Sequence, residues 1–135
     1  MAIITQPDSY TKLLIHSNHA DLSEDITDSS ASNHTITRSG AAKHRTTQAK
    51  FGASSIILDA NPYLTLPASS DWDVGSGDFT VDFWWYPNDL DRVWWISGMQ
   101  DHNFSIAYKH QSGDNIEIWA SSNGSSWDIL GDGAG

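Results

Sequence analysis

Two-residue alternation is strongest in the run Phe79-Thr80-Val81-Asp82-Phe83-Trp84-Trp85-Tyr86. Successive side chains of a β-strand point to opposite faces, so alternate residues of this run share a face. One face carries Phe79, Val81, Phe83 and Trp85, and the other carries Thr80, Asp82, Trp84 and Tyr86. The turn residues Gly75-Ser76-Gly77-Asp78 precede the run. We therefore expect a long strand that begins at Phe79 and packs its Phe79 face against a second sheet.

The rest of the chain shows the same pattern in shorter pieces. Asn103–Lys109 alternates with Phe104, Ile106 and Tyr108 on one face. Further predicted strands are Lys12–His16, His34–Arg38, Ser54–Asp59, Tyr63–Leu66, Val93–Gly98, Asn115–Ala120 and Ser126–Leu130. Turn residues separate these runs, and Asn123-Gly124 is typical of a tight hairpin. Asp21–Ser30 has too few apolar residues for a packed helix. The pattern predicts an all-β, antiparallel fold, either a sandwich or a barrel.

Composition limits the classes of function. The chain has 135 residues, no cysteine and a formal net charge of −10, so we expect one domain without disulfides or thiolate metal sites. An acidic surface repels phosphate and anionic lipid, which disfavours nucleic acid and membrane surfaces as partners. No run approaches the roughly 20 apolar residues that span a bilayer. Met1–Asp8 lacks the features of a signal peptide, so we expect synthesis in a host cytoplasm without signal-directed export.

Three blocks of the chain resemble a known family. The blocks are Leu13–His16 with Ile26–Ser30 and His34–Thr37; Ala49–Asp59 with Tyr63–Pro67; and Asp71–Trp84. Their order and spacing resemble the laminin-G-like domains, with a concanavalin A-like jelly roll, of phage tail and virion structural proteins. The resemblance implies an antiparallel two-sheet β-sandwich over residues 10–135 after an N-terminal extension at residues 1–9. It also implies a place in a virion, among other virion proteins or copies of the chain itself.

One departure from the family concerns the C-terminal end. Domains that the chain resembles continue past the Trp127 region with a Trp-His strand, a hairpin with an Asp-Gly turn and a closing strand. This sequence ends Gly131-Asp132-Gly133-Ala134-Gly135 instead. We therefore expect a sandwich that lacks its last strands and is completed by further chain or by a partner, since open strand edges are normally covered.

The residues favour a protein without catalytic activity. A glycoside hydrolase needs two carboxyl groups flanking the scissile bond. Glucanases of the fold that the chain resembles have a strand with closely spaced Glu, Asp and Glu, and this sequence has no such strand. Its glutamates are Glu24 and Glu117, and Asp82 has no evident carboxylate partner. No Gly-x-Ser-x-Gly elbow is present, and no helix or lysine follows Gly75-Ser76-Gly77 as a phosphate loop requires.

Calcium is the candidate ion. Asp21, Asp25 and Asp28 offer the oxygen ligands that Ca²⁺ prefers, and Asp71, Asp73 and Asp78 offer a second set. The spacing matches no EF-hand loop, and Asp-rich turns of acidic proteins often serve only as solvated caps. His16 and His19 are three residues apart without further ligands, which does not indicate zinc.

Aromatic residues are the remaining functional signal. Sugar rings stack on exposed Trp and Tyr, while Asp and Asn bind their hydroxyls. A glycan groove is thus predicted from Trp84, Tyr86, Trp94, Asp82 and Asn103. The alternative is that this face is also buried, by a loop or a neighbouring subunit. Two hypotheses follow: a phage tail-fibre or spike module that binds host-surface polysaccharide, or a purely structural virion protein in a capsid or tail. A glycosidase is a third, disfavoured hypothesis.

Overall fold

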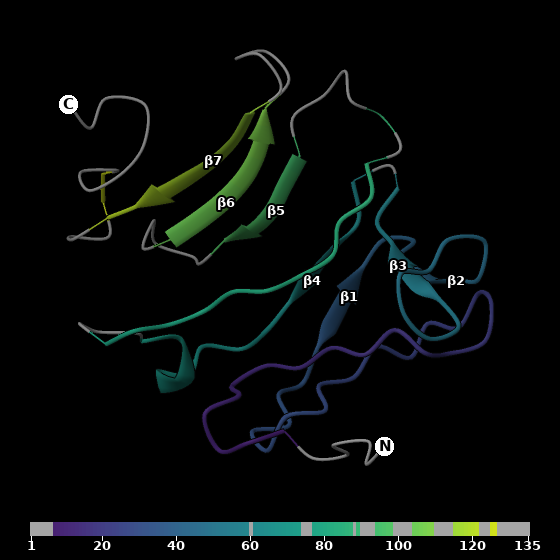
Figure 1. Ribbon diagram of the computed structural model, residues 1–135, viewed down its shortest axis with the longest axis horizontal. Coiled ribbons are helices and arrows are strands. Elements are labelled where there is room, and N and C mark those ends of the chain that lie inside the picture. Colours follow the sequence, from purple (N-terminus) through teal and green to yellow (C-terminus); the bar gives the residue numbers. More distant parts are fainter. Residues whose placement is uncertain are drawn as a thin grey trace. The chain divides into compact units, whose positions relative to one another are not determined.

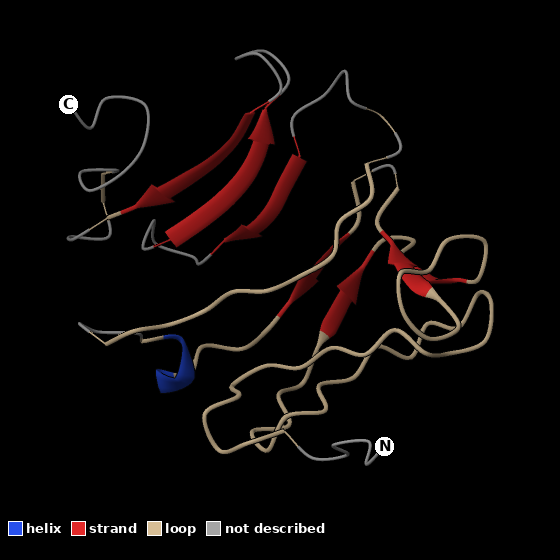
Figure 2. Cartoon of the chain, in the orientation of Figure 1, coloured by secondary structure: helices blue, strands red, loops and turns tan. Residues whose placement is uncertain are grey.

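The computed structural model describes residues 7–59, 61–73, 77–87, 89, 94–98, 104–109, 115–121 and 125–126 (Figure 1). The chain divides into two compact units, Met1–Trp84 and Trp85–Gly135, which are described separately. Every strand pair in the described residues is antiparallel, and their helical structure is limited to a 3₁₀ turn, η1, at Ser70–Trp72 (Figure 2). These features confirm the predicted all-β character. Within the described ranges, no helix has the length and apolar character needed to cross a bilayer.

The described residues of the first unit form two small sheets. Strand β1 (Thr37–Ser39) pairs with β4 (Tyr63–Thr65), with Arg38 opposite Leu64. Strand β2 (Lys43–Arg45) pairs with β3 (Ser55–Ile57), with His44 opposite Ile56. A short turn therefore separates β1 and β2, although the two strands belong to different sheets.

The described residues of the second unit form a three-stranded sheet with β6 in the middle (Figure 1). The strands are β5 (Trp94–Gly98), β6 (Phe104–Lys109) and β7 (Asn115–Ala120). The register of β5 against β6 shifts between Trp95 and Ser97, as a β-bulge does. On β7, Trp119 is buried whereas its neighbour Ile118 is exposed, in keeping with the two-residue period.

Most strands lie where alternation predicted them. Strand β7 coincides with the predicted run, and β3, β4, β5 and β6 lie within theirs. Strand β1 overlaps the predicted His34–Arg38 but ends one residue later. The predicted Lys12–His16 contributes an isolated bridge between Ile15 and Asp28 instead of a strand. Of the predicted Ser126–Leu130, only Ser126 lies within the described residues, and Asn123-Gly124 lies outside them.

Strand β2 was not predicted. Its sequence, Lys-His-Arg, has no apolar residue and therefore no hydrophobic alternation. It is extended because its backbone pairs with β3, whose Ile56 and Ile57 supply the apolar side chains of this sheet. Pairing with a distant segment, and not local propensity, forms this strand.

The prediction of a buried central strand at Phe79 is wrong for this structure. Residues 77–87 carry no strand assignment (Figure 2), and Phe79, Val81 and Phe83 are 50%, 47% and 41% exposed. Alternation indicates which side chains share a face, but burial of that face needs a covering layer. Trp84 and Tyr86, on the other face of the predicted strand, are also exposed, so neither face of this run is buried.

A histidine is the most completely buried large side chain described in the first unit. His44 has no exposed surface, and its Nε2 atom lies 2.9 Å from the carbonyl oxygen of Asp25. A carbonyl oxygen only accepts, so Nε2 of His44 donates this hydrogen bond. The Nδ1 atom forms a hydrogen bond with the Ser17 hydroxyl at 2.7 Å, and the hydroxyl of buried Ser54 lies 3.4 Å from it. His44 thus joins β2 to two loops through polar contacts.

A buried carboxylate organises the loop before β1. Asp28 accepts hydrogen bonds from the N–H groups of Leu14, Ser30 and His34, at 3.0, 2.8 and 2.8 Å, and from the Ser30 hydroxyl at 2.8 Å. Burial acts to raise the pKa of Asp28, but these four bonds outweigh it and hold the pKa below its ordinary value. The charged carboxylate therefore stabilises this loop.

Candidate ligand-binding site

Two exposed aromatic rings and a lysine meet on the first unit. The rings of Phe51 and Trp84 lie 5.6 Å apart between centroids with an interplanar angle of 77°, an edge-to-face pair. The Nζ atom of Lys50 lies 4.2 Å from the centroid of the Trp84 ring. Phe51 is 67% exposed and Trp84 is 66% exposed. We call these three residues the aromatic corner.

The backbone beside Phe51 is held in a conformation that favours glycine. Gly52 has a φ of +69°, in the left-handed region. A Cβ at this position would lie 2.9 Å from the Oδ1 atom of Asn18, which accepts a hydrogen bond from the N–H of Ala53 at 2.8 Å. The next residue, Ser54, is buried beside His44. Asn18 and the His44 network therefore hold the backbone that directly follows Phe51.

Lys50 differs from most other described cations in its partner. The ion pairs within the described ranges include Lys12 with Asp71, Arg38 with Glu24 and Arg45 with Asp21. Lys50 instead contacts an aromatic ring, an arrangement in which the ring quadrupole attracts the ammonium group. The aromatic corner is therefore a positive site on an acidic chain.

The structure locates part of the predicted glycan groove. Trp84 and Asp82 are exposed on the first unit, and Tyr86 is 71% exposed on the second. Trp94 begins β5, but its side chain lies outside the description, as does the whole of Asn103. The common groove of these five residues therefore stays a prediction, and Trp84 is the member that lies in a defined aromatic site.

Sequence reasoning missed Lys50 and Phe51 as members of a site. The sequence singled out Phe51-Gly52 as a tight corner, which agrees with the positive φ of Gly52. No local pattern links Phe51 to Trp84, because they are far apart in the chain and meet only in the folded unit. The adjacent pair Lys50-Phe51, next to a glycine, is the sequence feature that could have indicated this site.

The three carboxylates of the predicted calcium site have separate roles. Asp21 accepts from the N–H of Thr46 at 3.0 Å and faces Arg45 at 3.5 Å. Asp28 is buried with four donors, and Asp25 contacts His44 through its backbone carbonyl. In the described part of the chain no three His, Cys, Asp or Glu side chains are grouped to hold a metal ion, and this applies also to the second set, Asp71, Asp73 and Asp78.

A second polar cluster surrounds Asp71 in η1. Its Oδ2 atom accepts from the Ser32 hydroxyl at 2.6 Å and lies 3.0 Å from Nε2 of His34, while Nζ of Lys12 lies 3.5 Å from Oδ1. The Ser32 bond, together with His34 and Lys12, holds the pKa of Asp71 below its ordinary value against partial burial. The rings of His34 and Trp72 are 4.6 Å apart.

The Asp71 cluster does not have the geometry of a hydrolytic relay. Such a relay needs a serine bonded to the histidine and the histidine bonded to the carboxylate. Ser32 and His34 instead contact the same oxygen of Asp71. Ser17 and Ser54 both lie beside Nδ1 of His44, but the His44 ring is fully buried. Both arrangements act as ties between loops.

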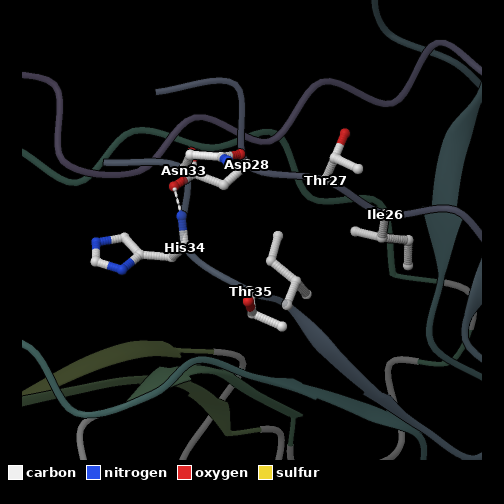
Figure 3. A pocket seen from close by; sticks show the side chains of 7 residues that line it. Ile26, Thr27, Asp28, Asn33, His34 and Thr35 are labelled. Atoms are coloured by element: carbon white, nitrogen blue, oxygen red, sulfur yellow. Dashed lines mark hydrogen bonds between the residues drawn. The ribbon is translucent and has the colours of Figure 1, made fainter. Parts of the chain in front are cut away.

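A shallow hollow of about 280 Å³ lies beside this cluster, lined by residues 26–28 and 33–36 (Figure 3). Figure 3 shows the backbone N–H of His34 donating to Asp28 at its wall. Asn33 has a φ of +48°, which allows the chain to turn there. The carboxylate of Asp28 is occupied by its four donors, so it supports the wall of the hollow and offers little to a ligand.

Comparison of the chain with protein-family models, with curated proteins and with solved structures found no match.

Proposed function

We propose that this chain is a non-catalytic carbohydrate-binding module that takes a sugar ring at the aromatic corner. The observation that carries the proposal is the exposure of Trp84 and Phe51 in an edge-to-face pair. Two large apolar rings left in water favour a ligand with an apolar face. The C–H face of a pyranose ring has this property, and its hydroxyl groups remain free to bind polar neighbours.

Polar groups near Trp84 suit a sugar better than a purely apolar ligand. Asp82 is exposed two residues before Trp84 and can accept hydrogen bonds from sugar hydroxyls. The ammonium group of Lys50, which contacts the Trp84 ring, supplies N–H donors. An aromatic surface with a few polar groups at its edge is the usual composition of a site that orients a small polar ligand.

The module, in our proposal, is a laminin-G-like sandwich carried by a phage particle. The antiparallel strand pairs support the sandwich, and the virion location follows from the resemblance of the three sequence blocks alone. Host-surface polysaccharide is the corresponding ligand. Calcium is not part of the proposed site.

A purely structural role in the virion is the second candidate function. The exposure of Phe79, Val81 and Phe83, at 50%, 47% and 41%, favours it. An apolar run of this kind is the sort of surface that another protein chain covers. In that case the aromatic side chains would be used for protein contacts and not for sugar.

A glycan array tests the proposal with the wild type, Trp84→Ala and a control variant, Tyr10→Ala. Tyr10 is 86% exposed and lies outside the aromatic corner, so its loss controls for a general effect of removing a surface ring. We expect the wild type and Tyr10→Ala to bind the same glycans, and Trp84→Ala to bind about tenfold more weakly or not at all. Absence of binding by the wild type, with stable oligomers in solution, would support the structural role instead.

A further inference from the structure

The charge at the aromatic corner is opposite to that of the chain. The sequence has 7 Lys and Arg residues against 17 Asp and Glu, for a net charge of −10. Among the described basic residues, Lys12, Arg38 and Arg45 each form an ion pair with a carboxylate. Lys50 is held against the Trp84 ring instead.

An ammonium group that contacts an aromatic ring can still bind an anion. The aromatic face attracts the ammonium group as a whole but offers it no lone pair, so the N–H groups directed away from the ring stay available. The contact with Trp84 also limits the positions of a long, flexible side chain, which lowers the entropy lost on binding a ligand. Lys50 is thus a positioned donor over the Trp84 ring, next in the chain to Phe51.

We infer that the glycan bound at the aromatic corner is acidic: its apolar face packs against one ring of the Phe51–Trp84 pair, and its carboxylate binds Nζ of Lys50. This inference rests on the proposed function and names the class of sugar. A hydroxyl would make an ordinary hydrogen bond with Lys50, whereas a carboxylate makes a charge-assisted one, which is stronger. Exposed Asp82 and the net charge of −10 disfavour any densely charged polyanion, so a glycan with isolated uronic-acid residues fits better.

The test compares acidic glycans with their own neutral forms. Acidic oligosaccharides are arrayed beside the same molecules after reduction of the carboxyl to a primary alcohol, which leaves the sugar ring unchanged. The full chain is tested as wild type, Lys50→Gln, Lys50→Arg and Trp84→Ala. Lys50 is exposed, so its substitution leaves the core unaltered, and circular dichroism of each variant checks the fold.

We expect the wild type to bind the acidic member of a pair at least about tenfold more tightly than the reduced member. Lys50→Gln should remove this preference while keeping the weaker binding of the reduced form, and Lys50→Arg should retain it. Trp84→Ala should weaken both. The preference should also shrink between 50 mM and 500 mM salt, by roughly the screening expected for exposed charges.

Two other results would distinguish a failure of the acidic-glycan inference from a failure of the proposed carbohydrate binding. Equal binding of acidic and reduced glycans, or an unchanged preference in Lys50→Gln, would overturn the inference and leave carbohydrate binding standing. Absence of any glycan binding by the wild type would overturn the proposed function, and the inference with it.

Discussion

The Nδ1 atom of His44 lies 2.7 Å from the hydroxyl oxygen of Ser17, and the same ring contacts the carbonyl of Asp25 through Nε2. One buried side chain therefore links β2 to two loops that precede it in the sequence. The backbone of His44 continues the link, because its N–H donates to Ser23 and its carbonyl accepts from Leu22. In the first unit, these buried hydrogen bonds therefore contribute to stability beside the hydrophobic contacts.

Replacing His44 should destabilise the first unit. His44→Ala removes a fully buried ring and leaves Ser17 and the Asp25 carbonyl without their partner, so we expect a loss of about 3 kcal/mol in the free energy of unfolding. Urea denaturation followed by circular dichroism measures it. His16→Ala is the control, because His16 is exposed and should change stability by less than about 0.5 kcal/mol. A similar stability for both variants would contradict the role of the His44 network.

The carboxylate of Asp28 predicts a loss of stability in acid. Its pKa is held below the ordinary value of 3.8, so its contribution is complete above pH 3.8 and is lost as the pH falls through the lower pKa of the folded state. Asp28→Asn should cost about 3 kcal/mol at neutral pH, because an amide cannot accept all four hydrogen bonds. Its stability should then fall less steeply than that of the wild type below pH 3.8.

Urea titrations from pH 7 to pH 2.5 provide the measurement. The exposed carboxylate of Asp59 gives the matched variant, Asp59→Asn, which should keep the stability and acid profile of the wild type. An Asp28→Asn variant with the same acid profile as the wild type would show that this carboxylate does not stabilise the fold by being charged.

Gly52 should be required for the geometry of the aromatic corner. Gly52→Ala places a Cβ 2.9 Å from Oδ1 of Asn18 at a φ of +69°, so we expect a loss of about 1–3 kcal/mol and weaker glycan binding. The double variant Gly52→Ala with Asn18→Ala removes the close contact but not the strained φ. If Asn18 is the obstacle, the double variant should lose less stability than the sum of the two single variants. Strict additivity would indicate that only the backbone conformation matters.

Calcium should not stabilise the chain through Asp21, Asp25 and Asp28. Asp21 and Asp28 already accept hydrogen bonds from the backbone or other side chains, and the three do not form a ligand set. We expect the melting temperature to be the same in millimolar calcium and in EDTA. Stabilisation by calcium that disappears in Asp25→Asn, but persists in Asp59→Asn, would show that these loops do bind the ion.

The local pattern of the chain was enough to predict strands β3 to β7, because alternation and turn residues act over a few neighbouring positions. It could not predict β2, whose Lys-His-Arg sequence is extended through pairing with β3. It also placed Phe79, Val81 and Phe83 in a core that the structure does not provide, since coverage of a face depends on distant segments.

The candidate site shows the same division. Trp84 was recognisable from its residue type and its strand parity, which are properties of the chain alone. Its partners Lys50 and Phe51 were not, because a contact between distant residues depends on the path of the folded backbone and not on spacing along the chain. Side-chain chemistry is written in the sequence, whereas the meeting of these side chains follows from the long-range packing that brings their segments together.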